Sequence, residues 1–177
     1  EESSHIPLLV GGGLPELGRG ESAGLISLVD LTPTILGFLD ISFQAREMDG
    51  EDLSRLFRDP AGEGAEYVYL YSLIPCHYAE TRGDCAWRAV RTKDYTYAIN
   101  ADTGEDWLLF ENAVDPYQTN NLIQSDHGID LTPLRSVLDL CMEKYDRRGP
   151  WQDLVKKNGL LDLWNGSQIH FRRPELQ

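Results

Sequence analysis

The spacing of apolar side chains predicts one strand and one helix near the start of the chain. Residues 6–10 (IPLLV) form a continuous apolar run closed by three glycines at 11–13, which is typical of a strand buried on both faces of a parallel sheet. Residues 25–41 carry apolar side chains at helical spacing, with Asp30 as the expected N-cap and Pro33 in the first turn. We therefore expect a strand, a loop and a helix in this order.

A second pattern, rich in aromatic and β-branched residues, predicts an antiparallel sheet in the middle of the chain. Residues 66–74 (EYVYLYSLI), 86–92 and 95–100 have the composition of strands, and the last two are joined by a tight turn at 93–94. Residues 100–106 (NADTGED) form a turn by composition, and residues 107–111 (WLLFE) supply a fourth strand. The four strands follow one another along the chain, which favours a meander.

A helix follows the predicted sheet and is expected to cover it. Apolar residues recur at three- and four-residue steps, with Thr132 as a cap and Pro133 at the first helical position, so we expect a helix over residues 133–148. The apolar positions of this helix are Leu134, Val137, Leu138, Cys141 and Tyr145. Residues 151–157 and 160–164 predict a second short helix, and the last ten residues are expected to be irregular.

The predicted strand at 6–10 has no partner strand, because the sequence offers no second βαβ unit beside it. The chain also begins with Glu1 rather than Met. We therefore expect residues 1–60 to be the end of a larger α/β domain that begins upstream, and residues 61–177 to be an antiparallel-sheet subdomain with a covering helix and a tail. The expected fold class is α/β overall and α+β in this portion.

Composition narrows the range of partners. The 177 residues hold 29 acidic and 16 basic side chains, for a net charge of −13, which repels phosphate backbones and argues against nucleic-acid binding. No apolar run approaches the length of about 20 residues that a membrane span needs. The chain contains no recognisable targeting segment, so the sequence does not indicate a localisation. A homo-oligomer is compatible with the sequence.

Most motifs in the sequence lack the residues that the corresponding binding or catalytic sites need. The loop at 13–20 (GLPELGRG) lacks the Lys and Ser or Thr of a phosphate loop, and the three cysteines lack the spacing of a zinc site. The tetrapeptide at 125–128 (SDHG) does not follow a strand and has no carboxylate cluster close by in sequence, so Asp126 and His127 are interpreted as loop residues. No Ser-His-Asp or Cys-His arrangement is evident, and we expect no catalytic residue and no metal ligand in this chain.

Three residues remain as candidate substrate contacts. His5 stands at the start of the predicted strand, within a polar segment, where the edge of a sheet often carries function. His77 lies in a loop with Arg82. Arg88 follows Trp87 in a predicted strand, and alternation along the strand places one of these two side chains in the core and the other outward. An outward Arg88 could hold an anionic substrate, since a guanidinium binds oxyanions with two parallel hydrogen bonds.

Four segments, in chain order, resemble the carboxy-terminal part of the sulfatases, in the alkaline-phosphatase-like superfamily. They are residues 1–10 (EESSHIPLLV), 27–41 (SLVDLTPTILGFLDI), 87–100 (WRAVRTKDYTYAIN) and 107–122 (WLLFENAVDPYQTNNL), and residues 48–57 (MDGEDLSRLF) also fit the family. The resemblance spans residues 1–122 and extends through the covering helix to about residue 148.

The resemblance implies hydrolysis of a sulfate ester by a formylglycine nucleophile with calcium. In the family the nucleophile is made from the first residue of a Cys/Ser-x-Pro-Ser/Ala-x-Arg motif, and none of the three cysteines here is followed by Pro two positions later. Nucleophile and calcium ligands are therefore expected in the missing amino-terminal part, with the remainder of the sulfatase chain as partner and a sulfated small molecule or carbohydrate as substrate.

The family also implies a role for this portion, which is to complete the fold and to shape the substrate cleft through the loop at 75–87. Two alternatives stay open at this point. The first is a phosphonate or phosphodiester hydrolase of the same superfamily, and the second is a non-catalytic interaction module.

Overall fold

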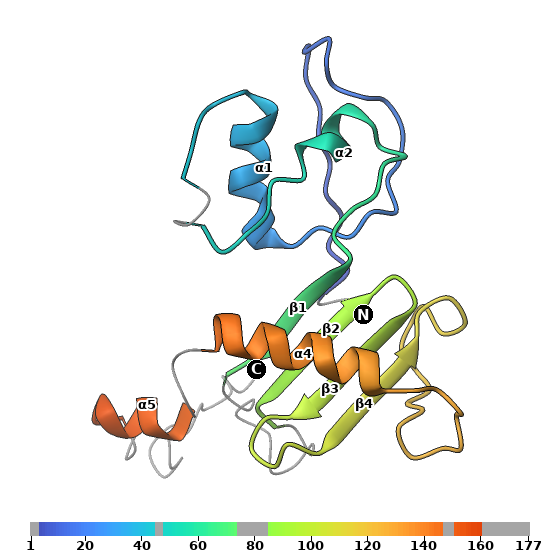
Figure 1. The fold of residues 1–177 in the computed structure, drawn as a ribbon, viewed down its shortest axis with the longest axis vertical. Helices are drawn as coiled ribbons and strands as arrows, with labels where there is room; N and C mark the ends of the chain where they lie inside the picture. Colours follow the sequence, from blue (N-terminus) through green and yellow to red (C-terminus); the bar gives the residue numbers. More distant parts are fainter. Residues whose placement is uncertain (1–3, 45–47, 74–84, 147–150, 161–177) are drawn as a thin grey trace, which may run out of the picture.

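The computed structural model describes residues 4–44, 48–73, 85–146 and 151–160, and the chain forms two parts (Figure 1). The front part, which comprises the described residues up to 64, contains the short 3-10 helix η1 (Leu28–Asp30), helix α1 (Leu31–Phe38) and helix α2 (Ser54–Arg58). The sheet part follows, with helix α4 (Thr132–Tyr145) lying across the sheet and helix α5 (Trp151–Lys157) after it in the chain. The mixture of helices and one antiparallel sheet confirms the expected fold class of this portion.

The sheet is a four-stranded antiparallel meander, as predicted. Its strands are β1 (Tyr67–Ser72), β2 (Trp87–Thr92), β3 (Tyr95–Asn100) and β4 (Asp106–Glu111), and they lie side by side in chain order. The register places Val90 and Leu109 on either side of Tyr97, so that these three side chains share one face of the sheet. An irregularity between Ala98 and Ile99 shifts the register of the last pair of strands.

Helix α4 (Thr132–Tyr145) covers this face of the sheet and closes the core (Figure 1). Leu134 and Leu138 pack against Val90, Tyr97 and Leu109, all of them buried. The predicted helix and its role as a cover are therefore confirmed, but the cap prediction is wrong, because Thr132 is the first helical residue and Leu131 is at the N-cap. Pro133 lies in the first turn, where a backbone N–H would have no partner within the helix. Helix α5 coincides with the first predicted stretch of the second helix, whereas residues 161–177 lie outside the described residues.

The front part departs from the expectation at residues 6–10. This segment has no regular secondary structure, and its apolar side chains are exposed, Leu9 to 95%. Residues 6–10 therefore form no strand in the described structure, and the predicted strand stays a prediction. A strand of a parallel sheet needs neighbours for its N–H and C=O groups, which no described segment provides here.

Asp30 and Thr34 hold the front part together. Asp30 is at the N-cap position of α1, as predicted, but its buried carboxylate accepts hydrogen bonds from the N–H groups of Ser27, at 2.7 Å, and Glu51, at 2.9 Å. The buried Thr34 hydroxyl accepts a bond of 3.0 Å from the N–H of Leu53 and donates one of 3.3 Å to the carbonyl of Glu51. These bonds join the segments 27–41 and 48–57, both of which carry the family resemblance.

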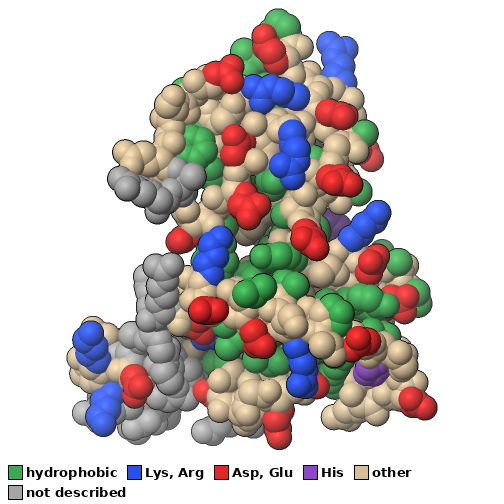
Figure 2. Space-filling view, in the orientation of Figure 1, with side chains coloured by type: hydrophobic (Ala, Val, Ile, Leu, Met, Phe, Trp, Pro, Cys, Tyr) green, Lys and Arg blue, Asp and Glu red, His purple; other side chains and the backbone are tan. Residues whose placement is uncertain are grey.

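Acidic and basic side chains are interspersed over the front part and α4, with no continuous basic area on this face (Figure 2). No helix within the described ranges has the length and apolar character that crossing a membrane requires.

Candidate functional site

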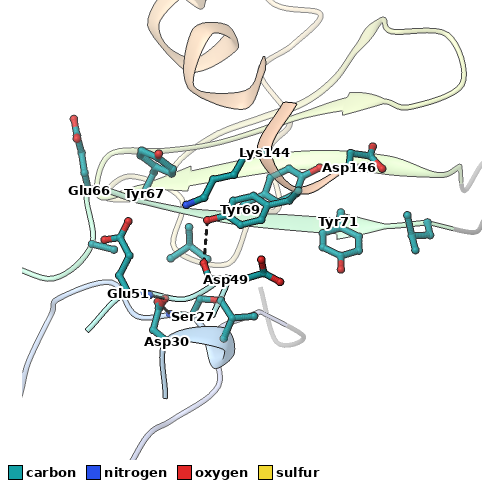
Figure 3. Close-up of a pocket in the computed structure, with 15 residues that line it drawn as sticks. Ser27, Asp30, Asp49, Glu51, Glu66, Tyr67, Tyr69, Tyr71, Lys144 and Asp146 are labelled. Carbon is teal, nitrogen blue, oxygen red and sulfur yellow. Dashed lines mark hydrogen bonds between the residues drawn. The ribbon is translucent and has the colours of Figure 1, made fainter. Parts of the chain in front are cut away.

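A cavity of about 530 Å³ lies between the front part and the sheet part (Figure 3). One wall is formed by strand β1 and the carboxyl end of α4, and the opposite wall is formed by residues 27–30 and 49–51. An isolated antiparallel bridge between Leu25 and Ala65 ties the two walls together at one end. The cavity therefore depends on how the front part sits on the sheet.

Tyrosines give the β1 wall its character. Tyr67, Tyr69 and Tyr71 alternate with apolar residues along β1, so their side chains project from the same face of the strand. The ring centroid of Tyr69 lies 5.4 Å from that of Tyr71 and 5.8 Å from that of Tyr145 at the end of α4. Three aromatic rings thus form one continuous row along the cavity.

The opposite wall is fixed by the hydrogen bonds of Asp30 described above and by close backbone packing. A Cβ atom on Gly50 would lie 2.1 Å from the carbonyl oxygen of Val29, so only glycine allows the segment 49–51 to approach this closely. The Tyr145 hydroxyl donates a hydrogen bond of 3.2 Å to the Asp49 carbonyl, marked by the dashed line in Figure 3. This bond connects the aromatic row to the opposite wall.

The electrostatics of the cavity are acidic. Its lining contains the carboxylates Asp30, Asp49, Glu51, Glu66 and Asp146 against one ammonium group, Lys144. The Lys144 nitrogen lies 4.6 Å from the centroid of the Tyr145 ring, and a hydrogen bond with Tyr145 raises the pKa of Lys144. The cavity therefore disfavours anionic groups, and its one cation is already placed on an aromatic face.

The hydroxyls of Tyr67 and Tyr69 stay protonated at neutral pH. Burial raises the pKa of Tyr69 and of Tyr67 above the ordinary value of 10.0. The buried Tyr69 hydroxyl forms no hydrogen bond within the described part of the chain. These groups are consequently suited to donating hydrogen bonds and not to acting as general bases.

Arg88, a predicted substrate contact, is buried beside the cavity. Its guanidinium is paired with Asp146 at 2.6 Å and donates bonds of 3.0 Å to the carbonyls of Ser72 and Trp87. The Arg88 side chain is thus held by partners from β1, from β2 and from the end of α4. Its geometry is explained by these protein partners, and contact with a substrate stays a prediction.

The other predicted site residues are not brought together with Arg88. His5 lies exposed in the segment that precedes residues 6–10, and neither it nor Arg88 lines the cavity. His77, with most of the loop at 75–87, falls outside the described residues. The predicted contacts therefore do not form one site in the described structure.

No calcium ligand set is present in the described ranges. No group of three or more His, Cys, Asp or Glu side chains there could hold a metal ion. The carboxylates that line the cavity form no such group either. His127 accepts a hydrogen bond of 3.0 Å at Nδ1 from the N–H of Ile129, which stabilises the loop before α4. The described residues do not fit a calcium ion.

Sequence reasoning did not identify the tyrosine-lined cavity. The alternation YVYLY in β1 is a usable signal, because it places three aromatic rings on one face. Nothing in the local sequence, however, indicates that this face meets Asp49 and Glu51 across a cavity, since that meeting depends on the packing of the front part.

Comparison with known proteins finds relatives in one functional class, although no protein-family model matches the chain. An ulvan-active sulfatase of Formosa agariphila is 32% identical over 124 residues, which is 70% of this chain and 23% of that protein. An endo-4-O-sulfatase of Bacteroides thetaiotaomicron is 26% identical over 144 residues, covering 72% of this chain and 27% of that protein. The chain spans about a quarter of the length of these curated relatives.

Solved structures agree on the fold. A structure in complex with its substrate D-glucosamine-2-N,6-O-disulfate matches 68% of this chain and 24% of its own, with a TM-score of 0.53 and 17% identity. Such structural neighbours have an alkaline-phosphatase-like fold, of which this chain matches the carboxy-terminal part.

Proposed function

Because the chain is a homologue of the carboxy-terminal portion of larger sulfatases, we propose that it is the corresponding portion of an enzyme that hydrolyses sulfate esters. The observation that carries the proposal is the 32% identity over 124 residues to a sulfatase that acts on ulvan. The proposed substrate is accordingly a sulfated small molecule or carbohydrate.

The proposal divides the chemistry between two parts of the enzyme. A formylglycine nucleophile and a calcium ion are proposed to belong to the part of the sulfatase that this chain does not contain. Two observations support this division: no described group of residues fits a metal ion, and no cysteine of the chain lies in the family's nucleophile motif. No bond-breaking step is therefore assigned to a residue of this chain.

The role proposed for this portion is to complete the fold and to shape the substrate cleft. The support is the exposed apolar surface of the front part, because apolar areas of this kind mark surfaces that contact another protein part. It is made by Ile6, Leu8, Leu9, Val10, Leu28, Val29, Ile35, Leu39 and Ile41. The proposed partner of this surface is the remainder of the sulfatase chain, against which residues 6–10 become a paired strand.

His5, His77 and Arg88 stay proposed substrate contacts. The position of Arg88 also bears on the loop at 75–87. Arg88 donates a hydrogen bond to the carbonyl of Ser72, the last residue of β1, and so fixes the end of the strand that precedes this loop in the chain. Besides its proposed contact with the substrate, Arg88 is therefore also proposed to position this loop.

The test is the release of sulfate by the full-length protein from a panel of sulfated oligosaccharides and aryl sulfates. A phosphodiester and a phosphonate ester serve as the comparison substrates. Preferred hydrolysis of sulfate esters supports the proposal, while preferred hydrolysis of the phosphorus esters selects the alternative hydrolase of the same superfamily. A full-length protein that cleaves neither class sinks the hydrolase proposal.

A further inference from the structure

We propose that the tyrosine-lined cavity between the front part and the sheet binds an uncharged saccharide unit. The inference rests on the proposed function, in that this unit would belong to the same sulfated carbohydrate, away from the sulfate that is removed. It adds a site with a defined chemistry that the homology to sulfatases does not supply.

The size of the cavity is the first argument. Its volume of about 530 Å³ is that of a small-molecule site, since such sites typically measure about 300–1,000 Å³. A metal ion would need at least three converging ligands, and within the described ranges no such group exists. The space therefore fits an organic ligand better than an ion.

The row of aromatic rings is the second argument. The wall carries a row of three rings in the spatial order Tyr71, Tyr69 and Tyr145. Tyr71, at one end of the row, is 54% exposed. A sugar ring offers apolar C–H groups on its faces and hydroxyl groups on its edge, and an aromatic ring with a polar end can meet both. The carboxylates of Asp49 and Glu51, across the cavity in Figure 3, can accept hydrogen bonds from sugar hydroxyls.

The charged groups that line the cavity favour an uncharged ligand. In the described lining, Asp146 is already neutralised by Arg88, and the other four carboxylates against one ammonium group repel a sulfate or a uronic acid. A cationic ligand would compete with Lys144, which already lies 4.6 Å over the Tyr145 ring. An uncharged ring avoids the repulsion and leaves Lys144 in place.

The direct test is binding of the fluorescently labelled full-length protein to an array of oligosaccharides, each present in an unsulfated and a sulfated form. We expect the protein to bind at least one unsulfated saccharide, and Tyr71→Ala to weaken this binding about tenfold. Tyr117→Ala is the matched control, because Tyr117 is 73% exposed and does not line the cavity. Tyr71 is exposed as well, so its replacement leaves the core intact.

A second pair of variants tests the charge argument. Glu51→Gln removes a carboxylate from the cavity, and we expect it to narrow the preference for the unsulfated over the sulfated form of the same saccharide. Glu105→Gln, an exposed change in the turn before β4, is expected to leave that preference as it is in the wild type. Binding of no saccharide, binding of sulfated forms only, or equal binding by wild type and Tyr71→Ala overturns the proposal.

Kinetics separate this inference from the proposed function. If the full-length protein hydrolyses sulfate esters, Tyr71→Ala is expected to raise the KM for a sulfated oligosaccharide more than the KM for a short aryl sulfate. Failure to hydrolyse any sulfate ester refutes the function, while the array still decides whether the cavity binds a saccharide.

Discussion

At the scale of single residues, the pair Arg88–Asp146 is the clearest case of a charge enclosed by the fold. The side chains are 5% and 17% exposed, and their ion pair connects the sheet to the residue that follows α4. A buried guanidinium is tolerated because its N–H groups are bonded to Asp146, Ser72 and Trp87.

We predict that Asp146→Ala destabilises the protein by about 3–5 kcal/mol, because it leaves the buried Arg88 charge without its partner. Asp139→Ala, on the exposed side of the same helix, is the control and should change stability by less than about 0.5 kcal/mol. Urea unfolding followed by circular dichroism measures both. Equal midpoints for the two variants would contradict a stabilising role of the pair.

A second residue-scale cluster makes stability depend on pH. The Tyr97 hydroxyl and the Arg135 guanidinium both donate hydrogen bonds to Asp106. Burial by itself would raise the pKa of Asp106, but the bonds from Tyr97 and Arg135 outweigh burial, and the pKa is lowered from 3.8. The stabilisation is therefore complete above the unfolded-state pKa of about 3.9 and is lost as the pH falls through the lower folded-state pKa.

We predict that Asp106→Asn lowers the free energy of unfolding at pH 7 by about 1.5–3 kcal/mol, which is typical for hydrogen bonds to a charged group. The difference from the wild type should shrink as the pH is lowered below about 4, since the wild-type carboxylate then becomes protonated as well. Urea unfolding at a series of pH values gives both curves. A difference that does not change with pH would show that the carboxylate charge of Asp106 contributes nothing, and Asp139→Asn serves as the reference.

At the scale of elements, local pattern and structure agree wherever an element buries a face within the chain. The meander and α4 follow the predicted periodicities because each strand pairs with its sequence neighbour and α4 places Leu134, Leu138 and Cys141 in the core. Residues 6–10 have equally apolar side chains, but no described strand pairs with them, so the same kind of signal gives no strand there.

The contact between the front part and the sheet rests on a close approach of two backbones. A Cβ atom on Gly64 would lie 2.3 Å from the backbone nitrogen of Leu25, next to the bridge between Leu25 and Ala65. We predict that Gly64→Ala destabilises the protein by about 1–3 kcal/mol, because the added methyl group forces these backbones apart. Thermal unfolding measures the effect.

Gly11→Ala is the matched control for that experiment, since no atom lies within 4 Å of its added Cβ. The two variants make the same chemical change, so a melting temperature that falls only for Gly64→Ala isolates the close approach. If both variants melt with the wild type, the two parts are not held together at this point. Saccharide binding by Gly64→Ala is then also expected to be unaffected, because the position of the cavity walls would not depend on this contact.

At the scale of the whole molecule, the chain joins a complete small sheet with its helix to a front part whose apolar surface is open. The core around Tyr97 is closed by residues of the chain itself, whereas Leu8, Leu9 and Ile35 remain exposed. This asymmetry agrees with the match to about a quarter of the length of two sulfatases.

The sequence by itself determined the order of the elements, the meander, the covering helix and the resemblance to the carboxy-terminal part of sulfatases. These follow from periodicity and from motifs that are local in the chain. Only the tertiary structure decided that Arg88 is enclosed by Asp146, that Asp30 joins Ser27 to Glu51, and that the tyrosines of β1 face a carboxylate-lined cavity. The physical reason is that such contacts join residues distant in sequence, whose meeting is set by packing and by the closing of hydrogen bonds, and no local pattern of side chains encodes that meeting.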